Sequence, residues 1–79
     1  MQPEHVIRFG AISASVFVNE METEGGKKTV RNVRLQRRYR SGEGEWKSSN
    51  SFTLTDLPVA IVVLQRALEY VASVEAEGV

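Results

Sequence analysis

Residues 46–74 read WKSSNSFTLTDLPVAIVVLQRALEYVASV, and the hydrophobic period changes within this stretch. Up to Leu54 apolar and polar residues alternate, which is typical of a half-buried strand with Phe52 and Leu54 on one face. From Leu57 onward apolar residues recur at the three- and four-residue spacing of a helix. We therefore predict a strand over residues 46–54 and then a helix. The expected core stripe of this helix is Leu57, Ile61, Leu64, Leu68 and Val71, with Ala60 and Ala67 beside them.

The predicted helix carries the usual signals at its ends. Thr55 or Asp56 can serve as the N-cap, because their side-chain oxygens can accept hydrogen bonds from free backbone N–H groups. Pro58 is tolerated because it falls in the first turn. Gly78 can end the helix.

The residues before this stretch predict three further strands. A short strand over residues 6–9 is divided by Gly10 from a longer one that begins at Ile12. Residues 20–28 contain two adjacent glycines among polar residues and predict a hairpin loop, after which residues 29–40 form the third strand. Residues 41–44, SGEG, predict the next turn. The chain is therefore expected to be one α+β domain over residues 1–79, with an ordered core over about 6–74. Its fold is a four-stranded antiparallel twisted sheet followed by one C-terminal helix.

A single helix covers one face of such a sheet and leaves the other face in water. The side chains expected under the helix are Ile12, Ala14, Val16, Val18, Val33, Leu35, Phe52 and Leu54. The side chains expected on the uncovered face are Ser13, Ser15, Phe17, Asn32, Arg34, Gln36, Arg38, Arg40, Lys47, Ser49 and Ser51. Arg37 falls in the phase of the covered face, so it is predicted to be a structural or edge residue.

Charge is distributed very unevenly along the 79 residues. Eight of the ten basic residues lie between Lys27 and Lys47, where Glu43 and Glu45 are the only acids, so this segment carries a charge of +6. The rest of the chain carries −6, and the formal net charge is zero. A concentrated cationic surface on a small domain is typical of a protein that binds a polyanion, above all nucleic acid. The alternative is a solvated face held together by salt bridges.

The predicted helix has more apolar residues than one sheet can cover. A surplus apolar stripe on a short chain without cysteine favours a homodimer related by a twofold axis. The alternative is scattered exposed apolar residues, which also occur in monomers. The expected interface residues are Val59, Val62, Val63 and Tyr70.

Composition argues against several functional classes. The chain has one histidine, His5, and no cysteine, so we expect no catalytic site, metal site or cofactor. Glu20, Glu22 and Glu24 share a predicted loop but lack the length and glycine placement of a calcium loop. No run approaches the roughly 20 apolar residues of a membrane span, and no secretion signal is recognisable. We expect a cytoplasmic protein with no membrane partner, nucleoid-associated if the source is a prokaryote.

Two segments resemble a known family. Residues 37–47, RRYRSGEGEWK, resemble the strand-turn-strand of the positive-cofactor-four family of transcriptional coactivators, whose fold is shared more loosely with the Whirly proteins. Residues 52–58, FTLTDLP, resemble that family's strand-to-helix junction, and the likeness spans about residues 6–74. It implies a homodimer whose helices and neighbouring strands meet, and a groove for single-stranded DNA or melted duplex. The contacts that it implies are Phe17, Arg34, Arg38, Arg40, Trp46 and Lys47.

Two functions remain open on these observations. The favoured one is a largely sequence-independent single-stranded nucleic-acid binder, DNA or RNA, that assists transcription or replication. Gln36 joins its expected contacts from the uncovered face, whereas alternation places Trp46 in core phase, where it would cover the helix–sheet core instead. The second function is a protein-interaction module that uses the basic face or an edge strand.

Overall fold

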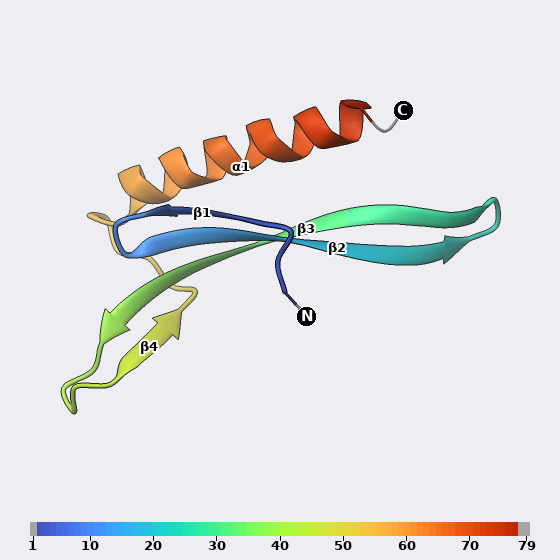
Figure 1. Ribbon diagram of the computed structural model, residues 1–79. Coiled ribbons are helices and arrows are strands. Elements are labelled where there is room, and N and C mark those ends of the chain that lie inside the picture. The colour runs from blue at the N-terminus through green and yellow to red at the C-terminus, as the bar shows by residue number, and fades with distance from the viewer. Residues whose placement is uncertain (1, 78–79) are drawn as a thin grey trace.

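The computed structural model describes residues 2–77, which form four strands and one helix. The strands are β1 (His5–Phe9), β2 (Ile12–Thr23), β3 (Gly26–Arg40) and β4 (Trp46–Ser49), and the helix is α1 (Leu57–Glu77). The strands lie in the order β1-β2-β3-β4, and each pairs antiparallel with its neighbour. Figure 1 shows the sheet twisting strongly while α1 crosses one of its faces. The predicted α+β layout is confirmed. Gly78, the predicted end of the helix, lies outside the described residues.

The first two turns between strands are short, and the second is shorter than the sequence predicted. Gly10 has a positive φ of 61° in the two-residue connection between β1 and β2, a conformation that glycine adopts without steric cost. The loop predicted over residues 20–28 is wrong, because β2 runs to Thr23 and β3 begins at Gly26. Its polar residues instead form an exposed two-stranded ribbon in which Glu22 pairs with Lys27. Opposite charges across strands stabilise such a ribbon without any buried face.

Strand β4 is shorter than predicted. It ends at Ser49, so residues 50–56 form the connection to α1 rather than the end of a strand. Phe52 still packs against the core, but Leu54 is 82% exposed, and its predicted place in the core is wrong. Alternation fails there because the backbone leaves the sheet after Ser49 and already turns at Thr53, whose carbonyl oxygen accepts a hydrogen bond from the Leu57 N–H (3.1 Å).

The first turn before α1 is held by a pair of residues in place of the predicted N-cap. The Asp56 carboxylate accepts hydrogen bonds from both the N–H and the Oγ1 of Thr53, each at 2.9 Å. The hydrogen bond from the Thr53 N–H to the Asp56 carboxylate is one of the two bonds of a capping box, with Thr53 in the position of the N-cap. Pro58 does fall in the first turn of α1, as predicted.

The core lies between β2 and one stripe of α1. Ile12, Ala14 and Val16 are buried from the strand, and Ala60, Val63 and Ala67 are buried from the helix. The predicted core stripe of the helix is therefore wrong in phase: Leu57, Ile61, Leu64 and Leu68 are 43–67% exposed. Both stripes have a helical period, so periodicity could not choose between them. Val33 is also largely exposed, against the prediction.

Candidate nucleic-acid interface

The register of β2 and β3 decides which side chains share the face away from α1. Residues directly opposite each other in an antiparallel pair lie on the same side of the sheet. Phe17 lies opposite Asn32 and Ser15 lies opposite Arg34, whereas Ala14 and Leu35 form a pair on the helix side. We use the name open face for the side chains that this register places away from α1. Outside the exposed ribbon of residues 20–29, they are Val6, Arg8, Ser13, Ser15, Phe17, Asn19, Val30, Asn32, Arg34, Gln36, Arg38, Arg40, Trp46 and Ser48.

Strand β4 has the opposite phase to the one predicted. Trp46 lies opposite Arg40 and therefore belongs to the open face, while Lys47 lies opposite Tyr39 on the helix side. Trp46 is 60% exposed, so its predicted role in covering the core is wrong. Alternation back from Phe52 predicts that Trp46 shares its side of the sheet. Residues 50–51 lie outside the strand, so alternation does not hold between Phe52 and Trp46. For the same reason Ser49, opposite Arg37, lies on the helix side.

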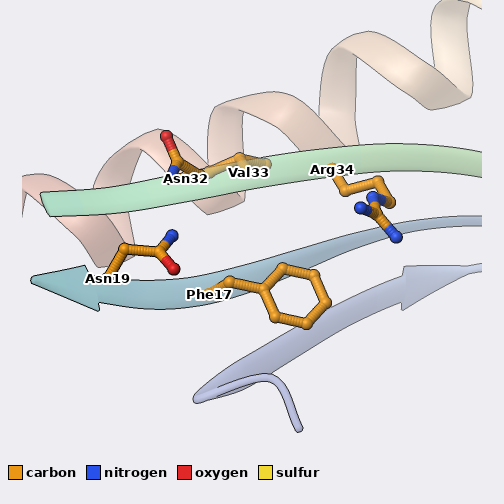
Figure 2. Close-up of a pocket in the computed structure, with 5 residues that line it drawn as sticks. All are labelled: Phe17, Asn19, Asn32, Val33 and Arg34. Atoms are coloured by element: carbon orange, nitrogen blue, oxygen red, sulfur yellow. The ribbon is translucent and has the colours of Figure 1, made fainter. Parts of the chain in front are cut away.

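Two aromatic rings on the open face each lie next to the guanidinium group of an arginine. The Arg34 guanidinium carbon lies 5.4 Å from the centre of the Phe17 ring, and that of Arg38 lies 5.2 Å from the centre of the Trp46 ring. Figure 2 shows the Phe17 ring and the Arg34 side chain extending toward each other from neighbouring strands. Both distances are within the range of cation–π attraction. Each pair thus joins a flat apolar surface to a positive charge.

Shallow hollows adjoin both aromatic pairs. The first has a volume of about 480 Å³ and is lined by Phe17, Asn19, Asn32, Val33 and Arg34. The second has a volume of about 450 Å³ and is lined by Arg8, Gly10, Ala11, Arg38 and Trp46. A third is lined by residues of both sides of the sheet, Arg34, Leu35, Gln36, Tyr39, Ser48, Ser49 and Asn50, so it lies at the edge of β3 next to the end of β4. The first two hollows therefore mark the two aromatic pairs on the open face.

Two of the basic residues are engaged in ion pairs with the protein itself. Arg31 donates two hydrogen bonds to the Glu4 carboxylate, at 2.9 and 3.1 Å. Arg37 lies 3.3 Å from Asp56 and donates to the carbonyl oxygen of Ser51 (3.2 Å). Arg37 is thus a structural residue, as predicted. Within residues 2–77, these two are the only arginines that form salt bridges, so Arg34, Arg38 and Arg40 keep their charge for a ligand.

The ion pairs also change the titration of their carboxylates. The hydrogen bonds from Arg31 lower the pKa of Glu4 below its ordinary value. The pKa of Asp56 is lowered chiefly by the backbone N–H of Thr53, then by the Thr53 hydroxyl, with a smaller effect from Arg37. Tyr70 stacks on His5, with ring centres 4.2 Å apart, and desolvation raises its pKa. These contacts tie the N-terminal segment to β3 and α1.

Sequence reasoning missed one basic residue of the open face. Arg8 lies on β1, opposite Ser13, and lines the same hollow as Arg38 and Trp46. Arg8 lies among apolar residues and outside the basic segment of residues 27–47, so the distribution of charge along the sequence did not predict it as a contact. Only the pairing of β1 with β2 brings it to this face. Of the predicted contacts, Phe17, Arg34, Gln36, Arg38, Arg40 and Trp46 share the open face, and Lys47 does not.

The residues predicted for a dimer interface do not form one exposed surface. Val63 is fully buried in the core, Val59 packs against that core, and Tyr70 is half-buried beside His5. Val62 alone among the four is exposed. Apart from Val62, the large exposed apolar residues of the helical region lie on a flank of α1 and in the turn before it. We call them the leucine stripe: Leu54, Leu57, Ile61, Leu64 and Leu68.

The composition of α1 has a further consequence. By length and mean hydropathy (1.5 over Leu57–Ala76) this helix could cross a membrane, contrary to the expectation that no segment would qualify. A helix that packs on a sheet can meet the same two criteria, and α1 does pack on β2.

Among residues 2–77 no three His, Cys, Asp or Glu side chains are grouped closely enough to hold a metal ion. Comparisons of the chain with protein-family models, curated proteins and solved structures found no match.

Proposed function

We propose that the protein binds single-stranded nucleic acid with little sequence preference. The observation that carries this proposal is the pairing of an aromatic ring with a guanidinium group at two places on one open face, at the half-buried Phe17 and the exposed Trp46. Nucleic-acid bases stack on such rings with about 1–3 kcal/mol per base, and arginines neutralise the phosphates that connect them. Every base has a flat π-face, so binding of this kind tolerates any sequence. A role in transcription or replication within the cytoplasm follows as part of the proposal.

Single strands suit this face better than a duplex does. The two rings lie on an open sheet surface, and a base can stack on them only when it has left its own helix. The described part of the face also presents a hydroxyl group from Ser15 and an amide group from Gln36 between the two rings. These groups can bond to sugars, phosphates or base edges without demanding one base.

We further propose that the protein acts as a homodimer through the leucine stripe. Its four residues on α1, Leu57, Ile61, Leu64 and Leu68, recur at intervals of four, three and four, which is the spacing of a seam between two packed helices. The protomer core is small, because three of its six buried hydrophobic residues are alanine. A second copy of α1 would bury the stripe and enlarge this core. A twofold axis places the same stripe on both partners and doubles the number of arginines available to one ligand.

One observation favours a different function. Strand β4 pairs only with Arg37–Arg40, so β3 has a long unpaired edge that begins at Gly26. An extended peptide could add to this edge as a further strand. A partner bound in this way would be insensitive to removal of the arginines on the open face, because backbone groups would hold it.

The test is a titration of labelled single- and double-stranded oligonucleotides at about 50 and 200 mM salt. We expect tighter binding of the single strand and a marked loss of affinity at the higher salt. The double variant Arg34→Ala with Arg38→Ala should weaken binding by a similar factor for every base composition. Lys47→Ala is the matched control, because it removes a charge from the opposite side of the sheet. Absence of binding to any oligonucleotide at the lower salt would overturn the proposal.

A further inference from the structure

We infer that the open face is a track with a base-stacking platform at each end, Phe17 and Trp46, and that one continuous single strand occupies both. This inference rests on the proposed function and adds to it a ligand length. The platforms lie on different strands, but each is opposite a residue of β3: Phe17 opposite Asn32 and Trp46 opposite Arg40. A strand rises about 3.3 Å per residue, so the eight residues between these positions separate the platforms by about 26 Å.

The track between the platforms is regular. Arg34, Gln36 and Arg38 all belong to the open face and follow one another at every second residue of β3. Two residues of a strand advance about 6.6 Å, which is nearly twice the 3.4 Å that separates stacked nucleotides along one strand of a duplex. A strand whose bases are unstacked and drawn out can match this longer step. At one nucleotide per step, about four steps connect the platforms, so about three nucleotides lie between the two that stack on the rings.

The Phe17 platform is a ring that the Arg34 guanidinium group approaches and that lies in a hollow lined also by two asparagines and Val33. Asn19 and Asn32 line the same hollow and offer amide groups beside the ring. A base stacked on Phe17 can therefore find donors and acceptors at its edge, and Arg34 can bond to the adjoining phosphate. The amides can turn either group outward, so the platform need not select one base.

The Trp46 platform has a larger ring and more positive charge. Its hollow is lined by two arginines, Arg8 from β1 and Arg38 from β3, and its remaining lining comes from Gly10 and Ala11. These two small residues leave space beside the indole ring for a base or a sugar. Trp46 is 60% exposed, so stacking can remove a large apolar surface from water. We expect this to be the stronger of the two platforms.

The length of the ligand distinguishes this track from two independent sites. A dinucleotide can occupy one platform only, whereas an oligonucleotide of about five or more nucleotides can reach both. The second stacking contact then becomes intramolecular, which raises affinity without any new kind of contact. Affinity should therefore rise steeply once the ligand spans both platforms, and more slowly beyond that length.

Trp46 provides a built-in probe, because it is the only tryptophan in the chain. The experiment titrates the protein with oligothymidylates and oligouridylates of about two, four, six and ten nucleotides. Tryptophan fluorescence reports stacking on Trp46, and the anisotropy of an end-labelled oligonucleotide reports total binding. The variants are Phe17→Ala and Trp46→Ala. The control is Phe9→Ala, which removes an exposed ring that pairs with Ile12 on the helix side.

We expect the longer oligonucleotides to quench Trp46 fluorescence and Phe17→Ala to weaken their binding about tenfold. The same substitution should leave the quenching of Trp46 by the dinucleotide unchanged, and Phe9→Ala should have no effect at either length.

Unchanged fluorescence during binding that anisotropy detects would overturn the two-platform track while leaving the proposed function intact. A Phe17→Ala effect that is equal at all lengths would do the same. Absence of any anisotropy change would overturn the proposed function itself. Comparison of the two oligonucleotide series decides between DNA and RNA as the preferred ligand.

Discussion

Asp56 is the residue that connects the sheet to the helix most directly. Its carboxylate accepts two hydrogen bonds from Thr53 and lies 3.3 Å from Arg37 on β3. Glu4 has a similar role near the N-terminus, where its carboxylate accepts hydrogen bonds from Arg31 on β3. Both carboxylates are ionised more readily in the folded chain than in the unfolded chain, since their pKa values are lowered. Their ionised forms therefore stabilise the fold.

The pH dependence of stability follows from these two groups. A lowered pKa means that the stabilisation is fully present at neutral pH and is lost as the pH falls through the folded pKa. The loss should begin near the ordinary values of 4.5 for Glu4 and 3.8 for Asp56 and continue below them. Urea unfolding at a series of pH values should show this fall. The variant Glu4→Gln with Asp56→Asn should be less stable at pH 7 and lose less stability in acid. Glu24→Gln, in the exposed turn between β2 and β3, is the control, and an equal acid dependence in all three proteins would contradict the assignment.

Trp46 and Lys47 show where residue-level prediction fails. The open-face positions of Phe17, Arg34, Gln36, Arg38 and Arg40 follow from alternation along β2 and β3, both of which are long and regular. The phase of β4 could not be obtained in the same way, because the chain leaves the strand after Ser49. One irregular step inverts every side chain. The pairing of Arg40 with Trp46, which the turn at residues 41–45 sets, decides the phase instead.

The helix shows a different limit at the scale of the element. Sequence predicted its existence and its position after the sheet, and both are confirmed. Sequence could not choose the buried face, because two apolar stripes share the same period and lie side by side on α1. The stripe with the smaller residues, Ala60, Val63 and Ala67, is the one in contact with the sheet. Hydrophobicity alone would have favoured the other stripe.

This choice of face can be tested by two substitutions on α1. Val63→Ala should lower the free energy of unfolding by about 2–3 kcal/mol, because it removes two buried methyl groups and leaves a cavity. Leu68→Ala removes a larger side chain, but one that is 67% exposed in the protomer. At low protein concentration, where any dimer has dissociated, it should change stability by less than about 0.5 kcal/mol. Urea unfolding measures both values. A larger loss for Leu68→Ala than for Val63→Ala under those conditions would mean that the helix packs through its other face.

At the scale of the whole molecule, the leucine stripe is the feature that favours a dimer. In one protomer it exposes five large apolar residues on a flank of α1 and the preceding turn. Sedimentation at micromolar concentration should detect a dimer, and Leu64→Glu should convert it to a folded monomer with an unchanged circular dichroism spectrum. Gln65→Glu adds the same charge at a neighbouring exposed position outside the stripe and should leave the dimer intact. Val63→Glu should unfold the protomer instead, since Val63 is fully buried. A wild-type monomer at this concentration would contradict the dimer.

Dimerisation and ligand binding are coupled through the salt dependence of affinity. Arg8, Arg34, Arg38 and Arg40 give each protomer four arginines on the open face that form no salt bridge within residues 2–77, or eight in a dimer. Each phosphate neutralised on a single strand contributes about −0.7 to the slope of log affinity against log salt, so a dimer holding one strand should give a slope near −6. Leu64→Glu should bring this slope to about −3, because a monomer offers only half of the cations. Gln65→Glu should keep the slope near that of the wild type, and it controls for the added negative charge. An equal slope in the monomeric variant would mean that a strand contacts only one protomer, so that the two tracks of the dimer bind separate ligands.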